Sequence, residues 1–406
     1  MKVLLLHNRY QLVGGEEAVV RGEKALLEAK GHQVTLLEIR NDELTSILKK
    51  ANAAVSAIYS PASKQRVSIE IAHFRPDVVH VHNFVPLLSP SVYDACRNAG
   101  VPVVQTLHNY RLGCPNAMFL RKGKVCENCL GKRMPWSGIV HGCYRGSRAQ
   151  SAVIASMLAV HWLRGTWQER VDAYIVLTAF QKEKMFQAGL PREKIYVKPN
   201  FVSDPKSLGQ TNVFGEYALF VGRLSREKSV TTLIEAYRHK HLRIPLKIVG
   251  DGPLRESLQA DVQAAGLEDV IEFLGRQEHL AVLSLMYKAR FLVFPSTWYE
   301  TFGLTMVEAF ACGLPVLASR LGSMAEIVED GITGLHFEAG NSADLADKMQ
   351  WANAHPEAMI SMGKNARRAY EAYYTPEINY QQLIAIYKQT IDIASPSRRT
   401  PTKSES

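Results

Sequence analysis

Residues 217–228 read YALFVGRLSREK, and the order of residue types in this stretch decides the expected fold. A short apolar run ends at Gly222, a basic turn follows, and a helical pattern begins near Ser229. The apolar runs Leu246–Val249 and Phe291–Phe294 are likewise each followed by a turn and a helical pattern. Short apolar runs that alternate with helical patterns are typical of βαβ units in a parallel sheet. We therefore predict a doubly wound α/β sheet in the second half of the chain.

The first half of the chain shows the same alternation. Its first helix is predicted at Glu16–Lys30, where apolar residues recur at helical spacing and Gly31 provides a C-terminal stop. Including those named above, the expected strands of the two halves are Val3–His7, Val34–Ile39, Asp77–Val81, Pro102–Leu107, Ala173–Leu177, Ile195–Lys198, Tyr217–Val221, Leu246–Val249, Val270–Leu274, Phe291–Phe294 and Pro315–Ala318.

The length of the chain points to two domains, because 406 residues exceed what one hydrophobic core usually covers. Periodicity is lost after Asn200. We expect two tandem Rossmann-like doubly wound α/β domains that face a cleft, an N-terminal one at residues 1–204 and a C-terminal one at 205–375. Residues 376–393 are predicted to form a C-terminal helix that can pack back on the N-terminal domain, and residues 394–406 a disordered tail.

Composition and charge narrow the function classes. The apolar and charged fractions, 47% and 21%, are those of a soluble folded protein. The net charge of +9 favours acidic partners such as nucleotide phosphates or lipid headgroups. Nucleic acid is not an expected partner, because the sequence has no recognition-helix pattern or zinc-finger spacing. No apolar run reaches the roughly 18 residues of a spanning helix, so we expect a cytoplasmic protein that could lie on the inner face of the plasma membrane.

Basic and glycine-rich turns follow two of the predicted strands. Arg223 and Lys228 come after the first, where Arg offers a bidentate fork and Lys a point charge to a diphosphate. Gly250 and Gly252 come after the second and permit a tight turn and the close approach of a ligand. Ligands of doubly wound sheets bind beyond the carboxyl ends of the strands. Taken alone, the first segment could equally be a solvated basic turn, and most turns like the second are only turns.

The strongest local signal is Pro295–Ala309, which reads PSTWYETFGLTMVEA. Glu300 lies in a turn after a strand, and a helix that begins near Gly303 carries Glu308. Backbone N–H groups of Phe302 to Leu304 can seat a phosphate or a sugar hydroxyl. Carboxylates accept hydrogen bonds from hydroxyls, so Glu300 suits a sugar and Glu308 a ribose. The alternative is that Glu300 only caps the helix and Glu308 lies on the surface.

Together these motifs resemble the retaining nucleotide-sugar glycosyltransferases of family 4, which have the GT-B fold. The turns GRLSREKS and GDGP and the pair Glu300 and Glu308 carry the resemblance. The segment Gly322–Gly334 and the turn Gly14-Gly15-Glu16 continue it. The resemblance spans nearly the whole chain and is densest from residue 217 to 337.

The resemblance implies a donor site in the second half of the chain. Arg223 and Lys228 would bind the donor diphosphate, and Glu308 would hold the ribose. Glu300 would contact the hydroxyls of the transferred sugar. The turn at Gly250 and the segment after Glu300 would complete the donor contacts, and the residues of that segment are Thr301, Phe302, Gly303 and Leu304.

In the first half, the resemblance implies that Gly15 lies close to the diphosphate or the acceptor. His108 matches a family histidine that approaches the transferred sugar. Asn109 follows it where many members have Asp. The implied catalytic set is therefore His108, Glu300, Arg223 and Lys228.

The family's retention of configuration implies that the nucleotide leaves from the face that the acceptor attacks, without an enzymic nucleophile. Arg and Lys would stabilise the leaving diphosphate, so no catalytic metal is expected. The implied donor is a UDP- or GDP-sugar, and the acceptor a glycan or a polyprenyl-linked sugar in cell-surface polysaccharide biosynthesis. Two alternatives stay open: an inactive nucleotide- or glycan-binding protein, and a phosphorylase or sucrose-synthase-type enzyme.

The segment at residues 110–150 is unexpected for this fold. Cys114, Cys126, Cys129 and Cys143 lie within it, and a C-x-x-C pair flanked by single cysteines could form a structural zinc site. Reduced packing thiols and a redox pair are the alternatives. His141 could replace one ligand.

Basic residues and Trp136 share this segment, and the apolar stretch Ala152–Trp162 follows it. Such a mixture suits peripheral contact with an anionic membrane, which would fit a lipid-linked acceptor. A solvated basic face beside an ordinary core helix is the alternative reading.

Overall fold

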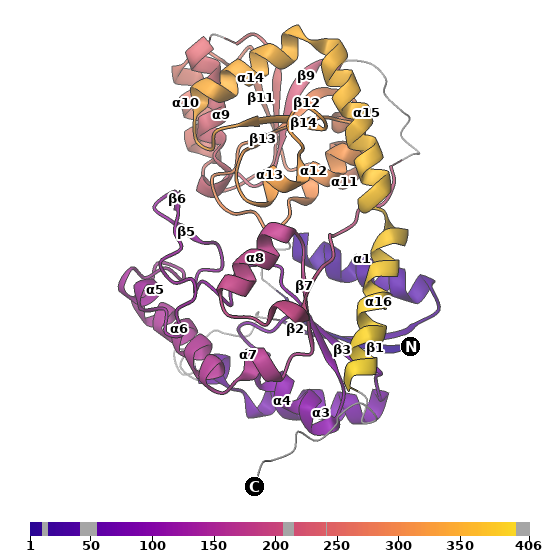
Figure 1. Cartoon of the computed structure of the whole chain (residues 1–406). Helices are drawn as coiled ribbons and strands as arrows, with labels where there is room; N and C mark the ends of the chain where they lie inside the picture. Colours follow the sequence, from indigo (N-terminus) through magenta and orange to yellow (C-terminus); the bar gives the residue numbers. More distant parts are fainter. Residues whose placement is uncertain (10–14, 41–54, 206–214, 241, 395–406) are drawn as a thin grey trace. The chain divides into compact units, whose positions relative to one another are not determined.

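The computed structural model describes residues 1–9, 15–40, 55–205, 215–240 and 242–394 (Figure 1). Its contacts divide the chain into two units. The first comprises Met1–Met118, Glu127–Lys198 and the chain from Asn379 onward, and the second comprises Phe119–Cys126 and Pro199–Ile378. The first unit is therefore built from both ends of the chain.

The first unit has a fully parallel sheet with strand order β2-β1-β3-β4-β7-β8. Its central strands read as nearly continuous apolar runs because helices cover both faces of such sheets. The strands are β1 (Lys2–Arg9), β2 (Gln33–Arg40), β3 (Val78–Asn83), β4 (Val103–Thr106), β7 (Ala173–Val176) and β8 (Ile195–Val197).

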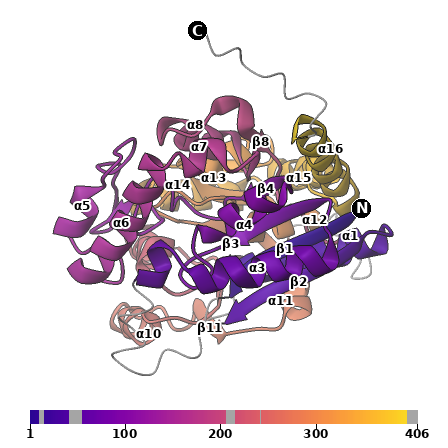
Figure 2. The same cartoon turned by 90° about the horizontal axis from the view of Figure 1, so that it is seen from below.

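Helices connect these strands, and α3 packs beside α4 (Figure 2). Ser60, Ser147 and Thr178 cap three of them by accepting a backbone N–H through the side-chain oxygen. The helices are α1 (Gly15–Ala29), α3 (Pro61–Phe74), α4 (Ser91–Ala99), α5 (Trp136–Val140), α6 (Arg148–Leu163), α7 (Thr166–Glu169) and α8 (Ala179–Gln187), with the 3-10 turn η1 (Arg192–Lys194). A short hairpin, β5 (Leu120–Arg121) and β6 (Lys124–Val125), lies between β4 and α5 in sequence.

The second unit has a parallel sheet with strand order β11-β10-β9-β12-β13-β14. Its strands are β9 (Tyr217–Val221), β10 (Leu246–Val249), β11 (Ile271–Gly275), β12 (Ala289–Phe294), β13 (Val316–Ser319) and β14 (Gly334–Phe337). Its helices are η3 (Arg226–Lys228), α9 (Val230–Lys240), α10 (Arg255–Ala264), α11 (His279–Tyr287), α12 (Leu304–Ala311), α13 (Ser323–Ile327), α14 (Ser342–Ala354) and α15 (Pro356–Tyr373).

Two parallel, Rossmann-like α/β halves confirm the predicted fold class. Two of the differences from the prediction concern strands of the parallel sheets. The third strand was expected at Asp77–Val81 but continues through His82 and Asn83, whose polar side chains are nonetheless buried. Strand β14 was not predicted, because its short run Gly334–Phe337 contains a glycine and a histidine and follows a turn.

The last helix, α16 (Pro376–Ala394), packs on the sheet of the first unit. Its residues Leu383 and Tyr387 are fully buried in one core with Val3 and Val78 of β1 and β3. In Figure 1 the helix runs beside these strands. The end of the chain therefore supplies part of the N-terminal core.

We predict that Leu383→Ala lowers the free energy of unfolding of the first unit by about 2–5 kcal/mol, because it leaves a cavity against β1. The control Ile393→Ala, at a position on the same helix that is 56% exposed, should change it by less than about 0.5 kcal/mol. Denaturant titration of the full chain measures both. Equal losses from the two variants would contradict the packing of α16 on this sheet.

Candidate functional site

Doubly wound sheets bind ligands at the carboxyl edge, where the strand order reverses. In the second unit this point lies between β9 and β12. Strand β9 leads into the turn Gly222–Lys228, and β12 leads into the loop Pro295–Gly303. The two segments are joined directly, because the N–H of Thr297 donates to the carbonyl of Glu227 at 3.0 Å. The strongest motifs of the sequence thus meet at one point.

The glycines near this edge allow two turns to pack against each other. A Cβ on Gly250 would lie 1.9 Å from the carbonyl oxygen of Gly222, and Gly250 has a φ of +135°. A Cβ on Gly252 would lie 2.4 Å from the carbonyl oxygen of Leu224. The N–H of Leu224 donates to the carbonyl of Asp251 at 3.0 Å. Close backbone packing therefore accounts for glycine at 250 and 252.

Lys228 and Glu300, 72 positions apart in the sequence, form an ion pair with Nζ 2.6 Å from Oε1. The carboxylate is 7% exposed and also accepts hydrogen bonds from Ser296 Oγ at 2.7 Å and Trp298 Nε1 at 2.8 Å. The hydroxyl of Ser323 donates to the backbone carbonyl of Glu300. Glu300 is therefore fixed by contacts with its own loop, with the β9 turn and with α13.

Arg223 lies at the end of β9 with an exposed side chain. The segment after Glu300 leads to Gly303, the N-cap of α12, whose φ of +92° favours glycine. Thr301 and Leu304 are half-buried, and Phe302 is buried. The N-terminal N–H groups of α12 therefore follow directly after the Glu300 turn.

Glu308 lies on α12 with its carboxyl group 17% exposed. Its Oε1 is 3.6 Å from Nδ1 of His279, at the start of α11. Burial raises the pKa of Glu308, and the nearby His279 opposes that rise. The carboxyl group is thus neither an unpaired buried charge nor an ordinary surface residue. No motif pointed to His279, which is a single histidine in an unremarkable segment.

In the first unit the strand order reverses between β1 and β3. His108 lies just after β4, beside a small cavity that is also lined by His82, Asn83 and Arg111. Its Nε2 is 2.9 Å from His82 Nδ1, and the two rings stack with centroids 5.2 Å apart. Burial is the largest cause that holds the pKa of His108 well below its usual value, and the neighbouring His82 ring lowers it further.

Gly15 begins α1, whereas its predicted neighbour Gly14 lies outside the described residues. The side-chain oxygen of Asn109 accepts from the N–H of Arg111 at 3.0 Å and so shapes the turn after His108. His7 and Glu16, to which the sequence analysis gave no functional role, bring buried polar atoms to the same edge. Burial, together with the nearby Glu17 carboxylate, raises the pKa of Glu16 to about 8.

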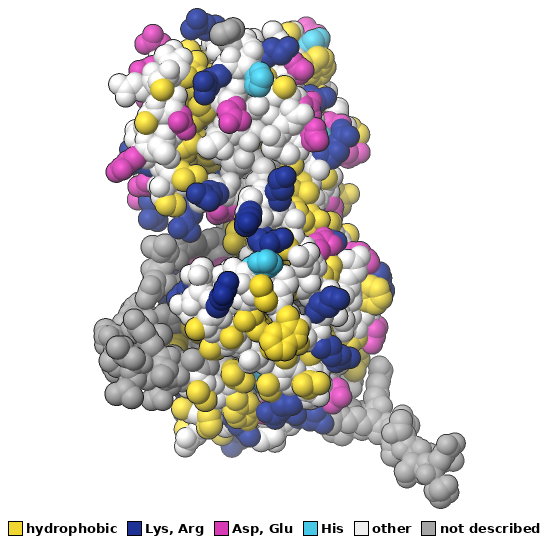
Figure 3. All heavy atoms as spheres, turned by 90° about the vertical axis from the view of Figure 1, so that its left-hand side faces the viewer, with side chains coloured by type: hydrophobic (Ala, Val, Ile, Leu, Met, Phe, Trp, Pro, Cys, Tyr) yellow, Lys and Arg dark blue, Asp and Glu magenta, His cyan; other side chains and the backbone are white. Residues whose placement is uncertain are grey.

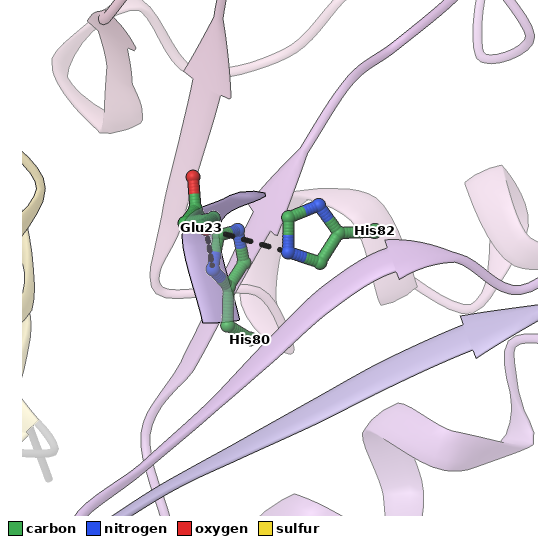
Figure 4. A group of neighbouring side chains, drawn as sticks. All are labelled: Glu23, His80 and His82. Carbon is green, nitrogen blue, oxygen red and sulfur yellow. Dashed lines mark ion pairs between the residues drawn. The ribbon is translucent and has the colours of Figure 1, made fainter. Parts of the chain in front are cut away.

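A second buried polar group was also missed. Glu23 of α1 lies between His80 and His82 of β3, with Oε1 3.0 Å from His80 Nδ1 and 3.4 Å from His82 Nε2 (Figure 4). Its other oxygen is 3.1 Å from Nζ of Lys198. The signal in the sequence was two histidines at alternate positions of a run that should be apolar in a parallel sheet.

Glu23, His80 and His82 are close enough together to hold a metal ion. However, Lys198 already places a buried ammonium group against the same carboxylate. A divalent cation would be repelled by this ammonium, and the ion pair supplies the positive charge that the carboxylate needs. The chemistry of this donor set therefore does not fit a resident metal.

The zinc site at the four cysteines stays a prediction. The four cysteines are all described, yet no three of their sulfurs gather at ligand spacing in the described part of the chain. Cys114 and Cys129 are buried, and the Cys114 thiol donates to Asn116 Oδ1 at 2.9 Å. Cys126 and Cys143 are half-buried.

Residues 13–204 match the family model described as Glycosyltransferase Family 4, and residues 210–369 match the model described as Glycosyl transferases group 1. An uncharacterized glycosyltransferase of Methanocaldococcus jannaschii is 38% identical over 37% of this chain and 42% of its own length. The D-inositol 3-phosphate glycosyltransferase of an Arthrobacter strain is 26% identical over 84% of this chain and 77% of its own. The aligned part of the chain spans about half the length of the first curated relatives it matches.

Among solved structures, Anabaena HepE in complex with UDP has a TM-score of 0.68 at 20% identity, covering 96% of this chain and 100% of its own. The same protein has also been solved with UDP-glucose. No described helix has the length and apolar character needed to cross a bilayer. With one family model matching each half and a GT-B glycosyltransferase fold throughout, the chain belongs to the family 4-like glycosyltransferases.

Proposed function

We propose that the protein transfers a hexose from a UDP-sugar to a glycan or polyprenyl-linked acceptor, with retention of anomeric configuration, in cell-surface polysaccharide biosynthesis. The observation that carries the proposal is the Lys228–Glu300 pair at the point where the strand order of the second sheet reverses. UDP is preferred over GDP as the donor nucleotide because HepE, which shares the fold, was solved with UDP and UDP-glucose.

In this proposal the donor diphosphate binds between Arg223 and Lys228. The Lys228 ammonium has three N–H donors, so it can contact a phosphate while it stays paired with Glu300. The guanidinium of Arg223 is exposed at the end of β9 and can present a bidentate fork. Glu308 accepts hydrogen bonds from the ribose, and the turn at Gly250 lies beside the diphosphate.

The transferred sugar lies against Glu300 and the N–H groups of the segment that follows it. Glu300 is held by Ser296 and Trp298, so its carboxylate keeps one orientation while it accepts a sugar hydroxyl. From the first unit, Gly15 is proposed to approach the diphosphate and His108 the transferred sugar. The donor-contacting backbone on the second unit runs through Thr301, Phe302, Gly303 and Leu304.

The reaction breaks the bond between the anomeric carbon and the diphosphate oxygen, and the electron pair leaves with the diphosphate. The acceptor oxygen forms its bond to the same face of that carbon, and its proton passes to the departing phosphate oxygen. Arg223 and Lys228 stabilise the negative charge that develops there. The protein contributes position and charge, and no covalent intermediate with a side chain is required.

A screen against UDP, GDP, ADP and their sugars tests this proposal. We expect UDP to raise the melting temperature. Lys228→Met should weaken UDP binding about 10- to 100-fold, because a charge-assisted hydrogen bond is lost. Lys240→Met, an exposed lysine of α9 paired with Asp347 at 3.1 Å, is the matched control. Binding that is equal in both variants would reject the site, and turnover of a UDP-sugar to a product of inverted configuration would reject the retaining mechanism.

Glu308 gives the donor site a pH dependence. Because burial raises its pKa above the ordinary 4.5, the carboxylate becomes protonated at a higher pH than an exposed glutamate. We expect affinity for UDP-glucose to fall as the pH is lowered, beginning above the ordinary titration range of a glutamate, since a protonated carboxyl is a poorer acceptor for ribose hydroxyls. Calorimetry at several pH values measures this slope. Glu308→Gln should bind more weakly with a flatter profile, and an unchanged slope in this variant would show that Glu308 is not the titrating group.

We assign the proposed membrane contact to a surface of the first unit that α5 and α6 form. Residues 131–164 contain no Asp or Glu, and their cations are Lys132, Arg133, Arg145, Arg148 and Arg164. Trp136, Val140 and Leu163 are 64%, 57% and 78% exposed in the same segment. Figure 3, which looks onto the side where α5 and α6 lie in Figure 1, shows hydrophobic side chains interspersed with Lys and Arg. Exposed apolar groups among cations fit an anionic lipid surface.

We expect the full chain to sediment with vesicles that contain anionic phosphatidylglycerol at low salt, and to bind neutral vesicles weakly. Trp136→Ser combined with Leu163→Ser should lower vesicle binding at least about tenfold, since each buried apolar side chain contributes about 1.5–3 kcal/mol. Leu280→Ser, at a 68% exposed position of the second unit, is the control. If the double variant bound as well as the control, this surface would not be the membrane contact.

A further inference from the structure

The polar group at the carboxyl end of β3 is not explained by the donor contacts proposed above. Glu23, His80, His82 and Lys198 are each no more than 3% exposed. A parallel β-strand covered on both faces is normally apolar, and burying ionisable groups is unfavourable unless they are paired. Their arrangement therefore calls for a physical reason.

Within this group, the negative charge of the carboxylate is balanced by the positive charge of the ammonium. Lys198 Nζ lies 3.1 Å from Glu23 Oε2 and 3.2 Å from Oδ1 of Asn379, which belongs to α16. Burial alone would raise the pKa of Glu23, but Lys198 and His80 outweigh burial and hold it well below its usual value. Glu23 is therefore a carboxylate, which accepts hydrogen bonds and cannot donate them.

The backbone aims His82 at this carboxylate. The pairing of β1 with β3 shifts register between Leu6 and His7, so that Leu6 pairs with Val81 while His7 pairs with Asn83. His82 is the extra residue of this bulge. Bulges redirect side chains next to functional sites. Here the bulge places His82 between the Glu23 carboxylate and the His108 ring.

These contacts determine which nitrogen of the His82 ring and which nitrogen of the His108 ring carries a proton. His82 Nε2 faces Glu23 Oε1 at 3.4 Å, and it makes no hydrogen bond of good geometry within the described residues. The other tautomer would turn a nitrogen lone pair toward the carboxylate, so a neutral His82 carries its proton on Nε2. Its Nδ1 is then an acceptor. Since His108 Nε2 lies 2.9 Å from that Nδ1, His108 must donate from Nε2.

His82 itself stays neutral. Burial and the adjacent His80 ring lower its pKa to about 4, so it carries no charge near pH 7. Both nitrogens of His80 are engaged, Nδ1 with Tyr387 Oη at 2.7 Å and Nε2 with Thr106 Oγ1 at 2.7 Å. The ring that borders His82 is therefore also held in place.

We propose that Glu23 and His82 are positioning residues that hold His108 as a neutral ring protonated on Nε2. This inference rests on the proposed function, in which His108 approaches the transferred sugar. Glycosyl transfer builds positive charge on the sugar ring as the leaving group departs. An imidazolium beside that ring would oppose this charge, whereas a neutral imidazole does not.

Two variants of one residue test the proposal. His82→Asn keeps a side-chain oxygen that can accept from His108, and His82→Leu has a similar size without an acceptor. In the full chain labelled with ¹⁵N-histidine, the ring signal of His108, assigned by its loss in His108→Gln, should show the Nε2-protonated neutral form. His82→Leu should abolish this fixed tautomer and lower kcat about tenfold, the effect of about one lost hydrogen bond. The KM for UDP-glucose should change by less than about twofold, because His108 itself is unaltered and most of the proposed donor contacts belong to the second unit.

His82→Asn should restore the tautomer and most of kcat. A His108 ring that is protonated on Nδ1 or positively charged at pH 7 in the unaltered protein would overturn the proposal. So would a His82→Leu variant with unchanged tautomer and kcat. If the unaltered protein turned over no nucleotide sugar, the proposed function would fail, while the NMR signal would still decide the tautomer.

A second variant covers the case in which His82→Leu does not fold. Glu23→Leu combined with Lys198→Met removes both charges of the buried pair, which is less destabilising than removing one. It also removes the carboxylate that faces His82 Nε2, so we expect the His108 signal to lose its single tautomer. A fixed Nε2-protonated His108 in this double variant would contradict the role of Glu23.

Discussion

Both units depend on the constraint that parallel strands bring their carboxyl ends to one edge of a sheet. The segments that follow β9 and β12 are far apart in sequence, yet the strand order makes them neighbours at the point where it reverses. Lys228 and Glu300 can pair only because of this topology. The same constraint in the first sheet gathers His82 and His108 from β3 and the end of β4. The strand order of each unit therefore determines which polar side chains come together.

At the carboxyl edge of each sheet, a buried glutamate is paired with a lysine. Glu300 is paired with Lys228 and receives two further hydrogen bonds, and Glu23 is paired with Lys198. Removing one partner of such a pair leaves an uncompensated charge, which is far more unfavourable than the pair contributes when intact. The benefit to the protein is a fixed orientation of the carboxylates. The pairs thus serve the geometry of the sites more than the stability of the fold.

Much of the fold was predictable because apolar runs and glycine turns alternate regularly along the chain. The donor-side residues were predictable as well, since Arg223, Lys228, Glu300 and Glu308 follow strands in recognisable motifs; the structure brings Lys228 and Glu300 together, and their roles remain proposals. The Glu23 and Lys198 pair was not predictable, because its partners are separated by 175 positions and neither lies in a motif. The zinc site stays a prediction for a related reason: the spacing of the four cysteines does not determine whether their sulfurs meet.

The position of α16 has a consequence for synthesis of the chain. A ribosome releases the strands of the first sheet early, but Leu383 and Tyr387, which complete their core, emerge only after the whole second unit. Domains usually fold in the order in which they are made. Here most of the second unit is one continuous segment and can reach its final fold first, while part of one face of the N-terminal sheet stays uncovered until α16 is made. Chaperone binding during synthesis should therefore concentrate on the half that is translated first.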